Sequence, residues 1–405
     1  MIQKEARKLD REAWLLITIN GLFAIANALS NTFVNIYLWK MNHDLITISW
    51  FQFSSYIGML IATLFAGWLT KKLDRVINIR LGVGILSIFY TTVLFLGTTA
   101  IQYVWILGAL LGIGSGFFWI AFSVLYFEIT ERPNRDRFNG VNGLFGALAG
   151  MISPLISGFV ISRIDHGLFG YQMIFTVSLV LFLIAVAVSF AFRPRLLQGD
   201  YYLFEVAKGL KHRDSKWYWV CAAMFLQGIR EGVLVYLVGL LLFMVVQKEM
   251  ILGGFLTATS FVALIANYII SRMITEKSRE MSMTVGTVML GVVILPFFFY
   301  PNIWTIFILG IGVAFFYPFY YGPLTSTIFD VLGENEHNVA WRVEHVAIKD
   351  TVLYLGRIVT VFLFIGWIHF SVALNHMRWY LLAVAFVQLP VILFARRFRS
   401  KFDRM

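Results

Sequence analysis

The chain has 405 residues, of which 59% are hydrophobic and only 14% are charged, and its mean hydropathy is +0.78. A soluble domain carries about a quarter charged residues, so this composition excludes an ordinary soluble globule and makes lipid the solvent for most of the chain. The single cysteine, Cys221, excludes a disulfide framework and a cysteine-based metal site, while the net charge of +11 requires a separate explanation.

Twelve apolar segments are long enough to cross a bilayer, whose hydrocarbon core of about 30 Å needs roughly 20 helical residues. They are too long for barrel strands and lack a sustained period of two, so we predict an all-α polytopic membrane protein. The segments lie near 14–39, 46–69, 78–98, 102–127, 140–162 and 171–192, and then near 217–247, 250–274, 281–299, 303–329, 347–370 and 377–396.

The charged stretch 193–216 separates the two groups of six segments. We therefore expect an N-terminal half at 1–192, a cytoplasmic linker at 193–216 that contains a short helix on the membrane surface, and a C-terminal half at 217–405. With both termini cytoplasmic, 26 of the 33 Lys and Arg residues lie on the cytoplasmic side and only 4 outside. This contrast sets the topology and assigns the positive charge to membrane anchoring rather than to nucleic acid.

Residues 111–118 read LGIGSGFF, and residues 309–316 read LGIGVAFF. Six of the eight positions match across a spacing of 198 residues, about half of the chain. Such a half-chain repeat in an apolar sequence is typical of transporters that are built from two related halves. It predicts two pseudo-symmetric six-helix bundles, with the repeated string in the fourth helix of each.

The loop after the second segment reads Gly67-Trp-Leu69-Thr-Lys71-Lys72-Leu-Asp74-Arg75-Val76. With the two six-helix halves, this loop resembles the major facilitator superfamily, whose motif at this place is G-x-L-a-D-r-x-G-r-k. The resemblance implies that Gly67, Lys71, Asp74 and Arg75 form a gating loop that latches the two halves. Lys71 replaces the motif's aspartate and Asp74 its second glycine. The antiporter motif G-P-x-x-G-G survives only in part, as Ser153-Pro154-Leu-Ile-Ser157-Gly158.

The first segment carries Asn20, Asn27, Asn31 and Asn35, which fall on one narrow stripe of a helix. Carboxamides are costly in lipid, so the stripe must face protein or water. The resemblance implies that helices 1, 4, 7 and 10 line the central cavity, which makes the four asparagines candidates for substrate binding. Hydrogen bonding between helices of the first half is the alternative.

The seventh segment carries Gln227, Arg230 and Glu231. Arg230 lies roughly 20 Å from the cytoplasmic boundary, and an ionisable residue at that depth is expensive and marks a functional site by default. The eleventh segment offers Lys349, Asp350 and Arg357 as partners. We expect Gln227, Arg230 and Arg357 to bind substrate and Glu231 and Asp350 to couple transport to protons. A buried ion pair that only rigidifies this half is the alternative.

Aromatic residues follow the repeated strings, and four of them are substrate-binding candidates, although packing is an alternative role for them: Phe118, Trp119, Tyr317 and Tyr320. The sequence has no phosphate-binding loop with a lysine and no histidines at metal-ligand spacing, so we expect no enzyme activity, no cofactor and no metal.

The expected function is secondary active transport by alternating access, coupled to protons. Export of a small amphipathic or hydrophobic compound is favoured by the aromatic residues and by the partial antiporter motif. Uptake of a small polar or anionic solute is the alternative, and a lipid flippase or a non-transporting sensor on the same fold is an alternative of another class. We expect a monomer in the cell membrane whose partners are the solute, protons and lipid, without nucleic acid.

Overall fold

The computed structural model describes residues 9–130, 132–164, 167–193, 199–213, 215–273, 278–334 and 340–398. These residues are almost entirely helical, and no β-strand is found among them. Residues 1–8 and 399–405, on which the expected position of the termini depends, lie outside this range, as do 194–198 and 214 of the expected linker. By their contacts the residues divide into two compact units, Met1–Tyr201 with Lys248–Thr257, and Tyr202–Gln247 with Ala258–Met405.

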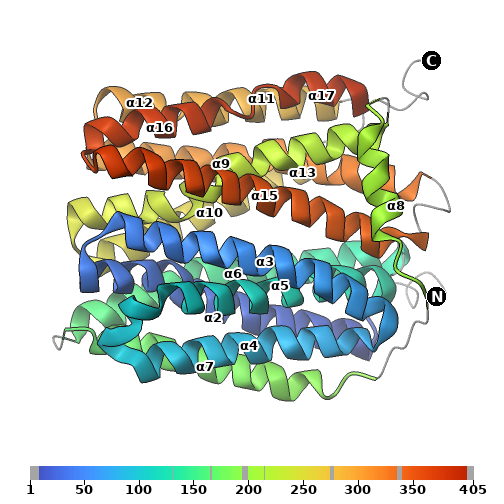
Figure 1. Ribbon diagram of the computed structural model, residues 1–405, viewed down its shortest axis with the longest axis horizontal. Coiled ribbons are helices and arrows are strands. Elements are labelled where there is room, and N and C mark those ends of the chain that lie inside the picture. The colour runs from blue at the N-terminus through green and yellow to red at the C-terminus, as the bar shows by residue number, and fades with distance from the viewer. Residues whose placement is uncertain are drawn as a thin grey trace. The chain divides into compact units, whose positions relative to one another are not determined.

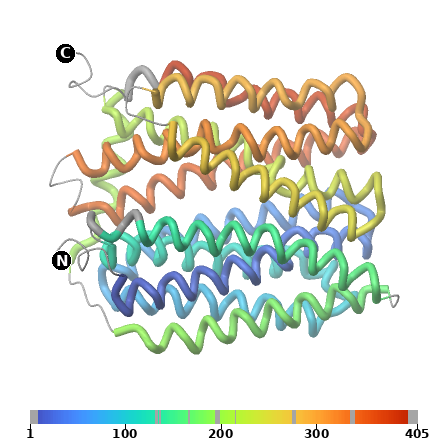
Figure 2. The backbone as a smooth tube through the Cα atoms, turned by 180° about the vertical axis from the view of Figure 1, so that it is seen from behind, coloured from blue at the N-terminus to red at the C-terminus, as the bar shows by residue number. Residues whose placement is uncertain are grey.

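Six long helices build the first unit, and Figure 1 shows them lying side by side as nearly parallel rods. Seen from behind in Figure 2, the dark blue α2 lies between the green α6 and α7, and it packs against both. The helices are α2 (Arg11–Asn42), α3 (Leu45–Lys72), α4 (Arg75–Leu96), α5 (Val104–Ile129), α6 (Arg132–Arg163) and α7 (Phe169–Ser189), with a 3-10 turn, η1 (Gly97–Tyr103), between α4 and α5.

The second unit begins with a short helix, α8 (Leu203–Lys208), which runs across the direction of the longer helices in Figure 1. It contacts α15, and the amide of Tyr202 donates to Glu344 at 3.2 Å. The other elements are η2 (Gly209–Lys211), α9 (Lys216–Val246), the later part of α10 (Glu249–Met273), α11 (Arg279–Val292), α12 (Leu295–Phe299), α13 (Ile303–Gly333), α15 (Arg342–Phe370), α16 (Leu374–Phe386) and α17 (Val391–Phe398).

Eleven described helical stretches are long and apolar enough to span a membrane, and one of them, Arg75–Ile129, has 55 residues. A straight helix of that length would measure about 80 Å, far more than a bilayer core of about 30 Å. The turn η1 breaks this stretch into α4 and α5, which gives two crossings and twelve in all. The expected ninth and twelfth segments are each divided into two helices, α11 with α12 and α16 with α17, while α13 continues through Pro318 and Pro323.

Backbone contact at glycine holds α3 and α5 together in the first unit. A Cβ on Gly112 would lie 1.9 Å from the carbonyl oxygen of Ser55, and one on Gly108 would lie 2.3 Å from that of Phe51. No larger residue fits such an approach, so Gly112 of the repeated string and the preceding Gly108 serve helix packing here. In the same unit, a Cβ on Gly253 at the start of α10 would lie 2.4 Å from the carbonyl oxygen of Pro154, within the partial antiporter motif.

The internal repeat is visible in how the first helix of each half ends. Both α2 and α9 end at a left-handed residue, His43 with φ 49° and Gln247 with φ 53°, and the next helix starts two residues later. These two residues are 204 positions apart, not the 198 of the repeated string, so one constant offset does not align the halves. For the first helices the shared end fixes the alignment, and it pairs Asn27 with Glu231, each 16 residues before the left-handed residue.

Candidate functional site

Close contact between α9 and α15 creates the candidate site in the second unit. A Cβ on Gly228 would lie 2.1 Å from the carbonyl oxygen of Leu353, and a Cβ on Gly356 would lie 2.3 Å from that of Phe225. Because the two backbones touch, side chains that flank these glycines on facing turns meet directly. Glu231 on α9 and Arg357 on α15 are such a pair.

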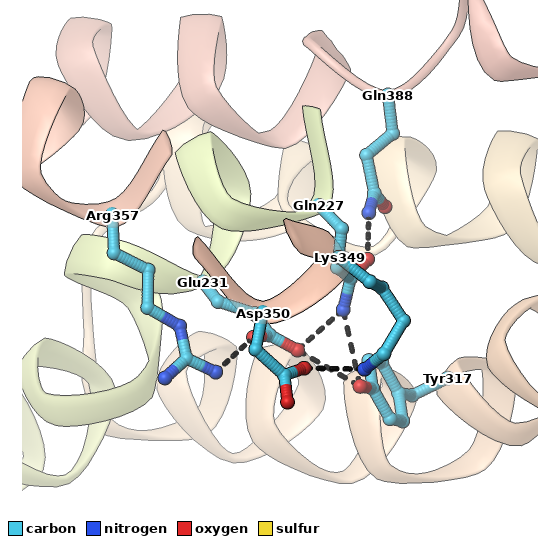
Figure 3. Close-up of polar contacts among 7 residues, drawn as sticks. All are labelled: Gln227, Glu231, Tyr317, Lys349, Asp350, Arg357 and Gln388. Atoms are coloured by element: carbon cyan, nitrogen blue, oxygen red, sulfur yellow. Dashed lines mark hydrogen bonds and ion pairs between the residues drawn. The ribbon is translucent and has the colours of Figure 1, made fainter. Parts of the chain in front are cut away.

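Glu231 is the centre of a polar network inside this apolar unit, and Figure 3 shows the side chains that converge on it. The carboxylate accepts a hydrogen bond from Arg357 Nη2 at 2.5 Å and another from the Tyr317 hydroxyl at 2.8 Å. Gln227 Nε2, one helical turn earlier on α9, also donates to it. The residue is only 8% exposed, so its charge is held by these three donors rather than by water.

Gln227 extends the network to two further elements. Its Nε2 also donates to the Tyr317 hydroxyl at 3.0 Å, which joins α9 to α13. Its Oε1 accepts from Gln388 Nε2, in the turn between α16 and α17. Gln227 and Gln388 are both fully buried. Since an unsatisfied buried amide is costly, these bonds fix the rotation of the helices around Glu231.

Two adjacent residues of α15, Lys349 and Asp350, form an ion pair with each other near this network in Figure 3. Their side chains are 18% and 13% exposed. Lys349, Asp350 and Arg357 were the predicted partners for the charges of α9. In the structure, Arg357 forms an ion pair with Glu231, and Lys349 forms one with Asp350. Asp350 precedes Arg357 by seven residues, so both lie on one face of α15.

Arg230, next to Glu231 in sequence, differs from the other charged residues of the cluster. It is 2% exposed, and its Nε and Nη2 atoms have no hydrogen-bond partner among the described residues. Tyr320, one turn after Tyr317 on α13, is completely buried with an unpaired hydroxyl, and it interacts electrostatically with Arg230. Unpaired atoms of Arg230 and Tyr320 therefore lie together beside the network around Glu231, in which the buried Gln388 Oε1 is also unpaired among the described residues.

The asparagine stripe of α2 divides into two kinds of position. Asn20 and Asn35 are buried and bond to neighbouring helices: Asn20 donates to Asn142 of α6 at 2.8 Å, and Asn35 accepts from Gln52 of α3 at 2.8 Å. The middle members, Asn27 and Asn31, are half-buried, and their side chains make no hydrogen bond within the described residues. The outer pair thus connects helices, and only the middle pair keeps free carboxamides.

The aromatic candidates of α5 also differ from each other. Phe118 is fully buried and stacks on Phe23, with ring centroids 3.8 Å apart and an interplanar angle of 2°. Trp119 is 41% exposed and meets Phe23 edge-on. Phe118 therefore packs within the first unit, and Trp119 is the residue that can meet a solute or lipid.

The candidate gating loop lies between α3 and α4. Asp74 caps α4 by accepting from the amide of Val76 at 3.0 Å, and buried Arg75 forms an ion pair with Glu128 near the end of α5. Gly67 is buried on α3, and Lys71 is half-buried. Arg75 therefore forms an ion pair within the first unit. The loop is distant in sequence from the cluster around Glu231.

Sequence reasoning did not single out Gln388, Asn142 or Gln52, each of which bonds to a candidate residue. The signal was present for Gln388, because a carboxamide in the apolar run AFVQLPVILF follows the same rule that marked the asparagines. Among the described residues, no group of three or more His, Cys, Asp or Glu residues is placed to hold a metal ion.

Comparisons with known proteins agree with this architecture. The chain is 39% identical to the "uncharacterized protein YqgE" of Bacillus subtilis (strain 168), over 86% of this chain and 81% of that protein. It is 42% identical to an "uncharacterized protein in sodM 3′ region" of Geobacillus stearothermophilus, over 50% of this chain and 94% of that one.

Among solved structures, the crystal structure of the E. coli fucose:proton symporter FucP matches with a TM-score of 0.66 over 96% of this chain and 98% of that one. The sequence identity there is 14%, so this match concerns the fold, which confirms the expected twelve-helix architecture. The family model "Major Facilitator Superfamily" matches residues 16–342. The chain is a multi-pass membrane protein and a secondary transporter, not an enzyme. It therefore belongs to the major facilitator superfamily.

Proposed function

We propose that this protein couples the movement of a small polar or anionic solute to protons, and that Glu231 carries the coupled proton. The observation that supports this proposal is the Glu231 network itself, a buried carboxylate held by Arg357, Tyr317 and Gln227 in the middle of a spanning helix. Ionisable residues inside a span are costly, and proton relays are one of the functions for which they are retained.

The arrangement suggests how one proton would change the site. Ionised Glu231 holds the Arg357 guanidinium by a charge-assisted bond at 2.5 Å. Protonation removes that charge, so Arg357 would be released from α9 and its positive charge would need another counter-ion. A solute anion bound within the same cluster would offset that charge, which links protonation to solute binding. Asp350 remains a second candidate for coupling, and a proton that it accepted would break its ion pair with Lys349.

The two halves differ at the position of the coupling group. Aligned by the left-handed ends of α2 and α9, Asn27 occupies in the first half the place of Glu231 in the second. The carboxamide of an asparagine does not gain or lose a proton near neutral pH, so we assign proton coupling to the second half. Asn27 and Asn31, whose carboxamides make no hydrogen bond among the described residues, are the proposed solute-binding residues of the first half.

Further features belong to the same proposal. Residues 1–192 and 217–405 would act as the two moving halves joined by 193–216. The excess of basic residues on one side supports a cell-membrane protein with cytoplasmic termini. We propose a monomer, because the mechanism needs no residue from a second copy.

Export of an amphipathic compound is the second candidate function. The 41% exposure of the Trp119 side chain favours it, because an exposed indole beside Phe23 offers a surface for apolar solutes. The direction of movement follows from the orientation of the protein in sealed vesicles. Protease protection of the C-terminus determines that orientation, and the side from which solute leaves then separates uptake from export.

The coupling proposal is tested in proteoliposomes that contain the pH dye pyranine, with a library of small solutes added outside and protein-free liposomes as the blank. We expect at least one polar or anionic solute to shift the internal pH with wild-type protein and not with Glu231→Gln. Glu334→Gln is the matched control, because Glu334 pairs with Lys216 at 2.6 Å outside the cluster. Solute-dependent proton movement that persists in Glu231→Gln would refute the proposal, as would its absence from the wild type with every solute.

A further inference from the structure

Arg230 presents a specific edge of its guanidinium without a partner. Nε and Nη2, the two nitrogen atoms that lack a hydrogen bond, lie along the same side of the planar group. That edge offers two parallel N–H donors, which match the two oxygens of a carboxylate. The unpaired atoms are therefore not scattered around the side chain, and together they form a complete recognition edge.

The cluster carries one more positive than negative charge, although Arg230 also interacts electrostatically with the neighbouring Glu231. The cations of the cluster are Arg230, Lys349 and Arg357, and its anions are Glu231 and Asp350. Glu231 is committed to Arg357 and Asp350 to Lys349, so one positive charge remains. A buried charge without compensation is strongly unfavourable, and a single added negative charge would balance the cluster.

Tyr320 supplies a third unpaired group at the same place. Its hydroxyl is buried without a hydrogen-bond partner among the described residues, and it lies within electrostatic reach of Arg230. A hydroxyl can donate to an anion that the guanidinium already holds. The neighbouring Tyr317 and Tyr321 stack with ring centroids 5.2 Å apart, which adds a flat apolar surface.

From these observations we propose that the transported solute is a monoanion whose carboxylate binds along the Nε–Nη2 edge of Arg230, with the Tyr320 hydroxyl as a third donor. Arg230 and Arg357 thus have different roles. Arg230 binds the solute, while Arg357 is released from Glu231 when Glu231 is protonated. The inference rests on the proposed function, since it assumes that this cluster is the solute site, and it adds the class of solute.

Binding is measured without transport, on the purified full-length chain in detergent. The single cysteine, Cys221, is 4% exposed, so its reaction with a maleimide dye during heating reports unfolding. The probes are acetate, lactate and benzoate at millimolar concentration, each paired with its neutral amide, and sodium chloride at the same ionic strength. We expect at least one carboxylate to raise the unfolding midpoint in a dose-dependent way, and its amide and chloride to leave it unchanged.

Three variants identify the binding group. Arg230→Gln should weaken the apparent affinity for the carboxylate by at least about tenfold, because it removes two charge-assisted bonds. Arg230→Lys keeps the charge but not the planar edge, so it should also bind weakly and remains informative if the glutamine variant fails to fold. Arg378→Gln should bind as the wild type does, because Arg378 lies in α16 and donates to the carbonyl of Phe298 at 3.1 Å, outside the cluster.

Equal stabilisation by a carboxylate and its amide, an unaltered effect in both Arg230 variants, or no effect of any carboxylate on the wild type would each overturn the inference. Results that contradict the carboxylate site can be distinguished from results that contradict proton coupling. Proton movement that depends on Glu231 without carboxylate binding would contradict the inference alone. Carboxylate binding that depends on Arg230 without any proton movement would contradict the coupling proposal alone.

Discussion

Replacing Glu231 by glutamine tests whether the network around it depends on charge. The substitution keeps the size of the side chain and removes the negative charge that accepts from Arg357, Tyr317 and Gln227. Breaking one side of a buried ion pair costs about 3–5 kcal/mol, because the other charge stays buried and unpaired. The Glu231 and Arg357 side chains are 10% and 19% exposed, which places the expected loss near the lower end, about 3 kcal/mol.

The double variant Glu231→Gln/Arg357→Gln removes both charges. It should therefore be more stable than the sum of the single variants predicts, with a coupling energy of about 2 kcal/mol. Unfolding is followed through the accessibility of Cys221, in denaturant series on the wild type, both single variants and the double variant. Glu334→Gln, which breaks the more exposed pair with Lys216, should cost less than about 1 kcal/mol. Additive losses from Glu231→Gln and Arg357→Gln would refute the claim that the two charges hold each other.

Three further predictions concern packing and the first unit. Gly356→Ala should destabilise the protein by about 1–3 kcal/mol, because its Cβ would lie 2.3 Å from a carbonyl oxygen of α9. Gly366→Ala on the same helix, with nothing within 4 Å, should be neutral or slightly stabilising in the same unfolding series. Arg75→Gln should cost about 3 kcal/mol, because it removes one partner of the buried ion pair with Glu128, and an unchanged unfolding midpoint would contradict that pairing. Asn20→Ala should lower stability by about 1 kcal/mol, whereas Asn27→Ala should spare stability and reduce solute transport; a reversed pattern would remove Asn27 from the proposed site.

The fold could be read from the sequence because lipid imposes a simple rule. A bilayer demands apolar segments of about 20 residues, and the chain meets this demand twelve times. Where the structure adds detail, the cause is local chemistry. The 3-10 turn η1 joins α4 and α5 through the polar stretch that begins at Gly97, whose φ is 51°. Apolarity already placed a break here, between the expected segments 78–98 and 102–127, but it does not give the backbone conformation of the turn.

The sequence predicted which residues belong to the site, but not which of them pair with each other. Arg230, Glu231 and Arg357 stand out because charges are rare in spans. Which cation meets Glu231 depends on how far α9 and α15 approach and how they are rotated, and those depend on Gly228 and Gly356. The sequence shows these glycines but not the facing carbonyl oxygens. The same limit explains why the unpaired edge of Arg230 became visible only with the neighbouring helices in place.

The asparagine stripe shows a similar limit. Helical spacing places the four side chains on one face, but it does not say which of them neighbouring helices reach. In the structure, Asn142 and Gln52 bond to the outer members and leave the middle ones free. The repeated LGIG string also gave an alignment offset of 198, while the first helices align at 204, because the two halves differ in helix and loop lengths.

The central claim is that Glu231 carries the coupled proton, and separating exchange from accumulation tests it most directly. The solute that moves protons in the pyranine assay is radiolabelled and followed in proteoliposomes, first as exchange at equal concentrations and then under an imposed pH gradient. Wild-type protein should show both exchange and accumulation driven by the gradient. Glu231→Gln should retain exchange and lose accumulation, because it binds the solute but cannot release a proton. Accumulation by Glu231→Gln at the wild-type level would contradict the account.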